Sequence, residues 1–152
     1  MDFMLGRLCR WLRLLGEDAE YYKQPDKSGI LYRSLKERRT VLTRDRRLAA
    51  RKAYGIQVIM SEDFREQLKE VSMKFSVRVA EERIYTRCTE CNSVLKSASG
   101  ESVRERVPEY IYRTHDAFSL CPGCGRVYWK GTHRDLISGI LDDLRKNQEG
   151  DK

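Results

Sequence analysis

The sequence predicts an α/β protein with a parallel sheet, flanking helices and a small C-terminal module that carries cysteines. Short apolar or β-branched runs alternate with helical patterns in the first half of the chain, as they do in βαβ units. Two C-x-x-C pairs stand in the second half. With 152 residues, of which 40% are hydrophobic, the chain is long enough for one medium domain and one small domain.

The first elements follow from the spacing of apolar residues. Leucines recur at intervals of three and four over residues 4–15, which predicts an amphipathic helix that Gly16 can end. A second helix is expected over residues 28–39, with Leu35 among its inward-facing residues. The β-branched run at residues 40–43 has charged neighbours, and it predicts a short buried strand.

The same alternation continues toward the middle of the chain. Asp45 is expected to begin a helix that ends at Gly55, and residues 56–59 form the next strand. Ser61 then caps a further helix. Residues 75–79 have the composition of one more strand. Because helices separate these strands, we expect the sheet to be parallel.

A change in composition near residues 81–87 indicates a domain boundary. We therefore expect an α/β domain at residues 1–82 and a cysteine-bearing module at residues 83–133. Residues 134–152 complete the chain with an amphipathic helix and a polar tail.

The two cysteine pairs have the spacing of metal-binding turns. Four thiolates from two C-x-x-C turns complete a tetrahedral zinc site, and such closed sites are usually structural. Two disulfides or a redox pair are the alternatives. Disulfide frameworks are typical of small secreted domains, and the sequence shows no signal peptide; a redox motif would occur once. We expect structural zinc on Cys88, Cys91, Cys121 and Cys124.

The chain is basic, which favours an anionic partner. It has 30 Lys and Arg against 23 Asp and Glu, a net charge of +7, and a pI near 9.3. Residues 33–52 hold nine of the basic residues and two acidic ones. Nucleic acid is the usual partner of such a protein, although a basic surface without a ligand has the same composition. No apolar run reaches the length of a membrane span, and we expect no membrane association and a cytoplasmic location.

Three aspartates precede predicted helices and are candidates for a cation site. Asp45 follows the strand at residues 40–43, and the carboxyl ends of strands are where α/β sheets bind ligands. Taken alone, Asp45 is more often a helix N-cap than a metal ligand. Asp2 and Asp26 also precede helices, and carboxylates that converge on one sheet edge repel one another unless a cation neutralises them.

Three segments resemble one known family. They are residues 4–16 (MLGRLCRWLRLLG), 41–49 (VLTRDRRLA) and 121–133 (CPGCGRVYWKGTH). Together they resemble the PIN-like ribonuclease domain named for the C-terminal part of the Mut-seven exonuclease. The resemblance covers almost the whole chain, and it implies a PIN-like parallel sheet with flanking helices, fused to a zinc ribbon.

The resemblance also implies an activity and its residues. It implies RNA cleavage that depends on Mg²⁺ or Mn²⁺, and the expected partners are RNA and a ribonucleoprotein. The acidic positions of the family correspond to Asp2, Asp26 and Asp45, whereas Asp63 is a weaker match. The basic residues expected to contact RNA are Arg7, Arg44, Arg46 and Arg47.

A second function stays open on the sequence. The family usually has a short hydrophobic strand before its first acidic residue, whereas only Met1 precedes Asp2 here. A frayed Asp2 would be poorly oriented, which predicts a noncatalytic RNA- or ribonucleoprotein-binding factor as the alternative. Of the two histidines, His115 is expected to make local hydrogen bonds, and His133 either contacts a phosphate or lies on the surface without such a role.

Overall fold

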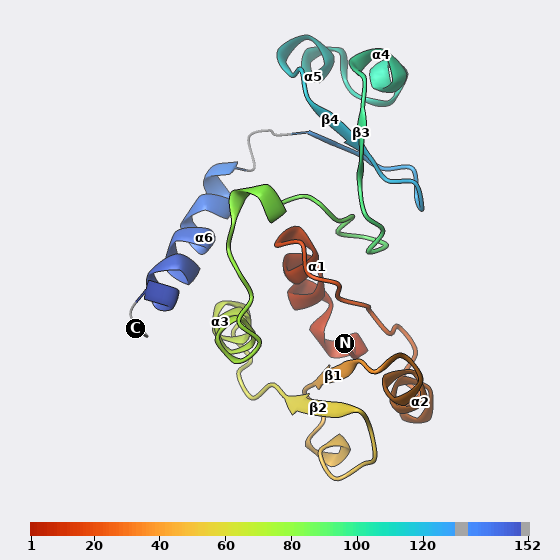
Figure 1. The fold of residues 1–152 in the computed structure, drawn as a ribbon, viewed down its shortest axis with the longest axis vertical. Helices are drawn as coiled ribbons and strands as arrows, with labels where there is room; N and C mark the ends of the chain where they lie inside the picture. Colours follow the sequence, from red (N-terminus) through yellow and green to blue (C-terminus); the bar gives the residue numbers. More distant parts are fainter. Residues whose placement is uncertain (130–133, 150–152) are drawn as a thin grey trace. The chain divides into compact units, whose positions relative to one another are not determined.

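The computed structural model describes residues 1–129 and 134–149, and it has the predicted mixed α/β class (Figure 1). The described chain forms two compact units. Unit 1 consists of residues 1–12 and 19–76. Unit 2 consists of residues 13–18 and the described residues from 77 onward. No helix in the described part of the chain is long and apolar enough to cross a membrane.

The first helix of the chain is the one predicted over residues 4–15. A 3-10 turn, η1 (Phe3–Leu5), leads into the α-helix α1 (Gly6–Leu14). The leucines expected on its inner face are buried. Gly16 has a φ of 84°, and its N–H donates to the Arg13 carbonyl over 2.9 Å. Gly16 therefore ends the helix in the left-handed conformation that glycine adopts without strain.

The second helix, α2 (Lys27–Glu37), begins one residue earlier than predicted. The expected burial of Leu35 is wrong, because its side chain is 45% exposed. The helix buries Ile30, Leu31 and Ser34 instead. At about 100° per residue, Leu35 lies roughly 90° from the middle of that face. Ser34 can be buried because its hydroxyl is satisfied by donating to the Arg39 carbonyl over 2.7 Å.

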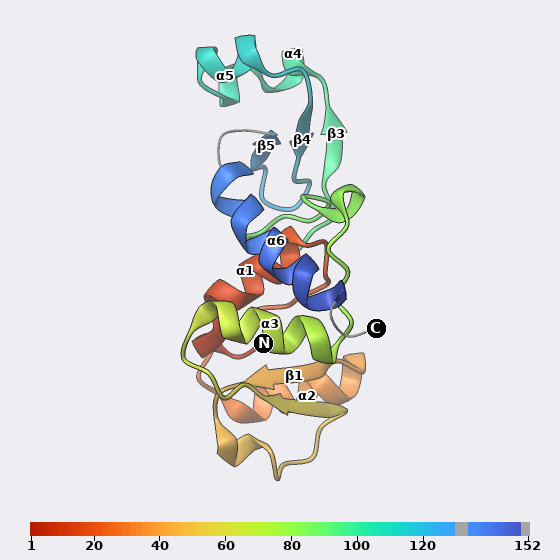
Figure 2. The ribbon, with the colours of Figure 1, turned by 90° about the vertical axis from the view of Figure 1, so that its left-hand side faces the viewer.

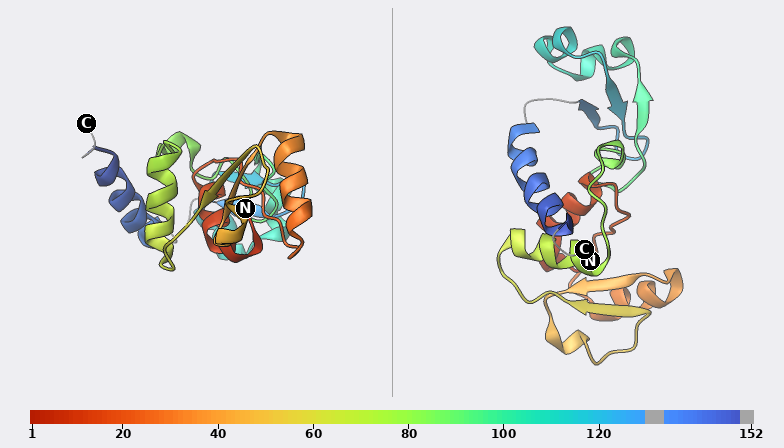
Figure 3. Two further views of the ribbon diagram at one scale, coloured as in Figure 1. Left: turned by 90° about the horizontal axis from the view of Figure 1, so that it is seen from below. Right: turned by 60° about the vertical axis from the view of Figure 1, so that its left-hand side comes forward.

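The sheet of unit 1 is parallel, as predicted. Strand β1 (Thr40–Thr43) pairs with β2 (Gly55–Val58), with Thr40 opposite Gly55 and Thr43 opposite Val58. Figures 2 and 3 show the two strands side by side, with α2 next to β1. The start of the chain lies beside β1 as well, because the Asp2 N–H donates to the Leu42 carbonyl over 3.0 Å.

Three expectations for residues 45–79 are wrong. The helix expected after Asp45 is only a 3-10 turn, η2 (Arg46–Leu48), because Leu48 is the one buried residue between positions 44 and 54. A helix with so little apolar surface gains too little from packing to extend.

The helix α3 (Phe64–Lys74) is capped by Asp63 and not by Ser61. The Asp63 carboxylate accepts from the backbone N–H groups of Arg65 and Glu66, over 2.9 and 3.1 Å. Residues 75–79 do not form a strand. Ser76 has a φ of 51°, which is incompatible with extended backbone.

Unit 2 contains an antiparallel sheet and short helices. The strands β3 (Lys96–Ala98), β4 (Phe118–Leu120) and β5 (Val127–Trp129) pair in chain order. The buried core beside them consists of Val103, Val107 and Phe118. Between β3 and β4 the chain forms α4 (Gly100–Val103), η4 (Arg104–Arg106) and α5 (Glu109–Thr114).

Two further helical segments complete unit 2. The 3-10 turn η3 (Glu81–Arg83) precedes the first cysteine pair. The amphipathic helix predicted near the end of the chain is present as α6 (Arg134–Glu149), with Leu141 and Leu144 buried. His133, for which a phosphate contact was considered, lies outside the described residues.

The end of α1 is built into unit 2 by hydrogen bonds. The Arg13 side chain, 5% exposed, donates to the carbonyls of Thr89 and Glu90 over 3.0 and 2.7 Å. The Tyr85 N–H donates to the Leu14 carbonyl over 2.9 Å. A buried guanidinium therefore supports the turn that carries the first cysteine pair.

We expect Arg13→Met to destabilise unit 2. Two carbonyls would lose a charged donor, which costs about 3 kcal/mol in the free energy of unfolding. Urea unfolding followed by circular dichroism measures the change. Arg10→Met alters an exposed arginine of the same helix, and it should cost no more than about 0.5 kcal/mol. Equal stability of the Arg13→Met protein and the wild type would contradict this role.

Candidate active site and metal centre

Asp2 is fixed at the carboxyl end of β1. Its side chain is 6% exposed, and its Oδ1 accepts from the Met4 N–H over 3.0 Å. Its Oδ2 accepts from the Thr43 hydroxyl and, over 3.3 Å, from the Arg44 N–H. These contacts contradict the expectation that Asp2 is frayed and poorly oriented.

Asp45 lies two residues beyond β1 and is surrounded by positive groups. Its N–H donates to the Thr43 hydroxyl over 3.0 Å. Its carboxylate caps η2 by accepting from the Arg47 N–H over 2.9 Å, and it forms ion pairs with Lys27 and with Arg47 Nε, the latter over 3.0 Å. The hydrogen bonds from the Arg47 and Lys27 side chains hold the pKa of Asp45 well below its usual range. Asp45 is therefore ionised at neutral pH.

Asp26 is the N-cap of α2. Its carboxylate oxygens accept from the N–H groups of Ser28 and Gly29, over 2.9 and 2.8 Å. The Tyr22 hydroxyl lies 3.4 Å from Oδ2. All three candidate acids are thus helix caps, which satisfies the N–H groups that a helix start leaves unpaired.

One cavity of about 470 Å³ brings the three acids together. Its walls also carry the basic residues Lys27, Arg44, Arg46 and Arg47. The apolar part of the wall is formed by Phe3, Met4, Tyr22, Pro25, Ile30 and Leu48.

The structure does not place Arg7 in this cavity. The Arg7 guanidinium lies over the Phe64 ring, 4.2 Å from its centroid. Lys27 is the residue of the cavity that sequence reasoning missed. Its position directly after Asp26, at the start of a helix, was the available signal.

Arg44 lines the cavity and, in the described part of the chain, has one buried N–H group without a partner. Its Nη2 donates to Glu62 Oε1 over 2.7 Å. Its Nε is buried and has no hydrogen-bond partner among the residues that the structure describes. A buried N–H without a partner is costly, so this donor is an unfavourable feature of the structure.

The carboxylates of the cavity do not form a closed cage. In the described part of the chain, the four cysteines are the one group of three or more His, Cys, Asp or Glu ligand atoms that lie within 4.8 Å of one another. Asp2, Asp26 and Asp45 thus line one cavity, but the structure does not bring their carboxylate oxygens within 4.8 Å of one another.

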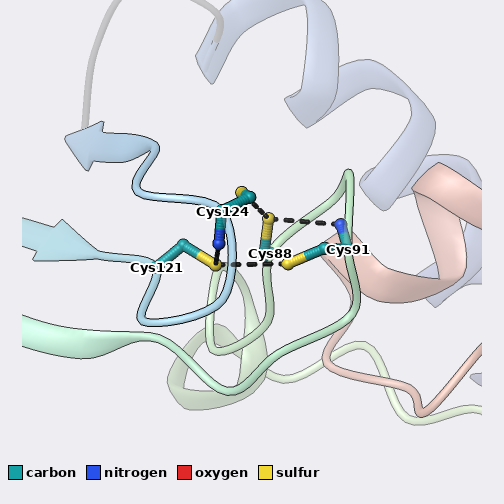
Figure 4. Close-up of side chains that lie close together, drawn as sticks. All are labelled: Cys88, Cys91, Cys121 and Cys124. Atoms are coloured by element: carbon teal, nitrogen blue, oxygen red, sulfur yellow. Dashed lines mark hydrogen bonds between the residues drawn. The ribbon is translucent and has the colours of Figure 1, made fainter.

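The four cysteines form a separate centre in unit 2 (Figure 4). The sulfur–sulfur distance is 3.5 Å between Cys88 and Cys124 and 3.3 Å between Cys91 and Cys121. A tetrahedron with metal–sulfur bonds of ~2.3 Å has edges of about 3.8 Å, so the sulfurs are nearly at metal-binding distance. All four thiols are free, which excludes the disulfide alternative for this structure. The cluster is therefore able to hold a metal ion such as zinc.

The thiols of this cluster differ in acidity. Burial alone would raise the pKa of Cys91, but hydrogen bonds, led by that with Ser93, lower it to about 6. A backbone hydrogen bond from Arg126 lowers the pKa of Cys124, but burial and the neighbouring sulfurs outweigh it and raise the pKa to about 12. Like charges this close do not all form unless a cation neutralises them.

Tyr128 adds a hydrogen bond to the cluster. Its hydroxyl lies 3.0 Å from Cys88 Sγ and accepts from the Thr89 N–H over 3.2 Å. Burial, followed by the hydrogen bond with Cys88, raises the pKa of Tyr128 to about 12. The hydroxyl therefore stays protonated and can donate a hydrogen bond to a thiolate. His115 makes the expected local contacts, with the Ile111 carbonyl and the Thr114 hydroxyl.

The fold and its two sites define an α/β protein with an acidic and basic cavity and a separate four-cysteine centre. The family model described as the Mut7-C RNAse domain matches residues 1–141. The chain therefore belongs to the Mut7-C ribonuclease family, which confirms the resemblance found in its sequence. Neither the curated proteins nor the solved structures contain a match to it.

We expect the purified protein to carry one metal ion per chain at the cysteine centre. Cys88→Ser should abolish binding of that ion and unfold the turn around it, because the loss of any one of the four ligands opens a tetrahedral site. Metal analysis after gel filtration measures the stoichiometry. Cys9→Ala, which changes the one cysteine outside the cluster, should keep the ion. A native Cys88–Cys91 disulfide, or a metal content unaffected by Cys88→Ser, would refute the centre.

Proposed function

We propose that the protein is a ribonuclease that cleaves RNA phosphodiester bonds with Mg²⁺ or Mn²⁺ in the cavity of unit 1. The cavity carries the proposal, because it combines three carboxylates with four basic side chains at the carboxyl end of β1. Membership of the Mut7-C ribonuclease family supports RNA as the substrate. Action on a ribonucleoprotein and a cytoplasmic location stay predictions from the sequence.

The residues present fit a divalent cation. Carboxylate oxygens are the ligands that hard cations prefer, and Asp45 already attracts an ammonium group and a guanidinium. One or two of the carboxylates of Asp2, Asp26 and Asp45 would hold the cation, because Mg²⁺ keeps several waters and also binds substrate phosphates. When bound, it would activate a water molecule for attack on phosphorus and neutralise developing negative charge.

The chain's own residues supply the other parts of the reaction. Arg46 and Arg47 are exposed at the cavity and neutralise the charge of the RNA backbone. Arg44 adds a further positive charge at the cavity. Positioned donors stabilise charge in the transition state without having to reorganise.

The cysteine centre has a different role in this proposal. We infer that it binds zinc, because four thiolates in a tetrahedral arrangement are the usual structural zinc site. Four protein ligands leave no open coordination position for a substrate. The zinc would therefore hold the two cysteine turns together and take no part in cleavage.

One observation favours a second candidate, a noncatalytic RNA- or ribonucleoprotein-binding factor with a degenerate site. The three aspartates all cap helices, and Asp45 is ion-paired with two basic side chains. Capping alone would explain an aspartate at each position. The two candidate functions predict different effects of an isosteric substitution at Asp45.

Asp45→Asn tests the nuclease. Asparagine caps a helix about as well as aspartate, so folding should survive. Cleavage should fall by about 100-fold or more, because the charge that binds the cation is removed. The rate of cleavage of a labelled RNA in Mn²⁺ measures the effect. The matched control is Asp63→Asn, which alters the cap of α3 outside the cavity and should be nearly silent.

Two outcomes would decide against parts of this proposal. Full Mn²⁺-dependent cleavage by the Asp45→Asn protein would show that Asp45 is not a ligand of the catalytic cation. Absence of cleavage by the wild type on structured and unstructured RNA, with RNA binding intact, would favour the noncatalytic candidate.

RNA binding should depend steeply on salt, because each neutralised phosphate releases counterions. Changing Arg44, Arg46 and Arg47 to Gln should weaken binding to unrelated RNA sequences alike. The slope of log affinity against log salt should flatten by about 2, at ~0.7 per contact on a single strand. Fluorescence anisotropy measures both quantities. The same change at Arg65, Lys69 and Lys74 of α3 is the control, and an equal effect there would show that the cavity is not the binding surface.

A further inference from the structure

Lys27 holds Asp45 from a different element of unit 1. It is the first residue of α2 and follows Asp26 directly, whereas Asp45 follows β1. The Lys27 ammonium is ion-paired with Asp45 Oδ2. The Lys27 side chain is 46% exposed and that of Asp45 only 15%, so a sheltered carboxylate is joined to a more accessible cation.

The two cations on Asp45 are not equivalent. Arg47 is held at Asp45 by its own backbone N–H, which donates to Oδ1, and by its guanidinium, whose Nε donates to Oδ1 and whose Nη2 donates to Oδ2 over 3.3 Å. Lys27 reaches Oδ2 with its side chain only. Releasing Lys27 would therefore leave the cap of η2 intact. A lysine suits such an exchange, because its ammonium is a compact charge on a flexible stem.

We propose that Lys27 is a resident counter-ion of Asp45, which a divalent cation must displace and whose freed ammonium then contacts the phosphate of the RNA. This inference rests on the proposed function of the same cavity. The ammonium and the cation compete for Oδ2, and they repel each other when close. The cavity walls carry Lys27 next to three arginines, so a displaced ammonium stays where an anion is expected to bind.

The competition has a consequence for cation affinity that is measurable without RNA. If Lys27 occupies Asp45 for nine-tenths of the time, its removal raises the affinity about tenfold, because only the unoccupied fraction binds. Lys27→Met should therefore bind Mn²⁺ about tenfold more tightly than the wild type. Titration of free Mn²⁺ by electron paramagnetic resonance, on the full chain with its cysteine centre filled, measures this change.

Three variants separate displacement from a general effect of charge. Lys36→Met removes the same charge from the other end of α2, outside the cavity, and should change the affinity for Mn²⁺ less than about twofold. Lys27→Arg keeps the competing charge and should resemble the wild type. Lys27→Gln repeats the test with a polar side chain if Lys27→Met does not fold.

The second half of the inference predicts a dependence of RNA binding on the cation. Without Mn²⁺, Lys27→Met and Lys36→Met should bind a labelled oligouridylate equally, because Lys27 is engaged with Asp45. With saturating Mn²⁺, Lys27→Met should bind it about fivefold more weakly, because the freed ammonium is missing. Stopped-flow anisotropy reads the affinity before cleavage products accumulate.

The outcomes distinguish this inference from the proposed function. If Lys27→Met binds Mn²⁺ no more tightly than Lys36→Met, while Asp45→Asn loses Mn²⁺, Lys27 is not a competing counter-ion and the nuclease proposal stands. If no variant, nor the wild type, binds Mn²⁺ in the cavity, both fail. Tighter Mn²⁺ binding with unchanged RNA affinity would overturn the phosphate contact alone.

Discussion

The buried hydroxyl of Thr43 is the group on which the candidate site depends. It donates to Asp2 Oδ2 and accepts from the Asp45 N–H over 3.0 Å, and it is inaccessible to solvent. Two acids that are far apart in the sequence are therefore held by one side chain at the last position of β1. A β-branched residue is stiff at χ1 and favoured in strands, so the same residue suits the sheet, orients the Asp2 carboxylate and fixes the backbone of Asp45.

Helix capping and cation binding are compatible uses of these aspartates. A carboxylate has about four lone-pair sites, so an oxygen that accepts an N–H keeps capacity for a second partner. The N–H groups at a helix start also stabilise negative charge. The caps keep the acids in place, and Lys27 and Arg47 neutralise Asp45 when no metal ion is bound. The sheltered negative charge of Asp45 is thus tolerated because basic residues neutralise it, but these residues then occupy the carboxylate oxygens that a metal ion would need.

Sequence patterns predicted the regular elements and the cysteine centre, and they were weakest where local chemistry competes with periodicity. Each pattern that predicted an element correctly reflects one dominant interaction. These patterns are the leucine spacing of α1, the β-branched run of β1 and the two C-x-x-C pairs. The segment after Asp45 was predicted to be a helix containing Leu48, Ala49 and Ala53, but one buried side chain does not sustain a helix. Lys27 could not be assigned, because its partner depends on how α2 meets the end of β1.

Helix α1 belongs to both units, since residues 6–12 lie in unit 1 and its last two residues lie in unit 2. The acceptors of Arg13 are carbonyls at positions 89 and 90, beyond the boundary at residue 82 that the sequence suggests. A chain of only the first 82 residues would lack the Thr89 and Glu90 carbonyls to which the Arg13 guanidinium donates. The carboxylate cavity and the cysteine centre are thus connected through one helix, in agreement with a single family model that spans both units.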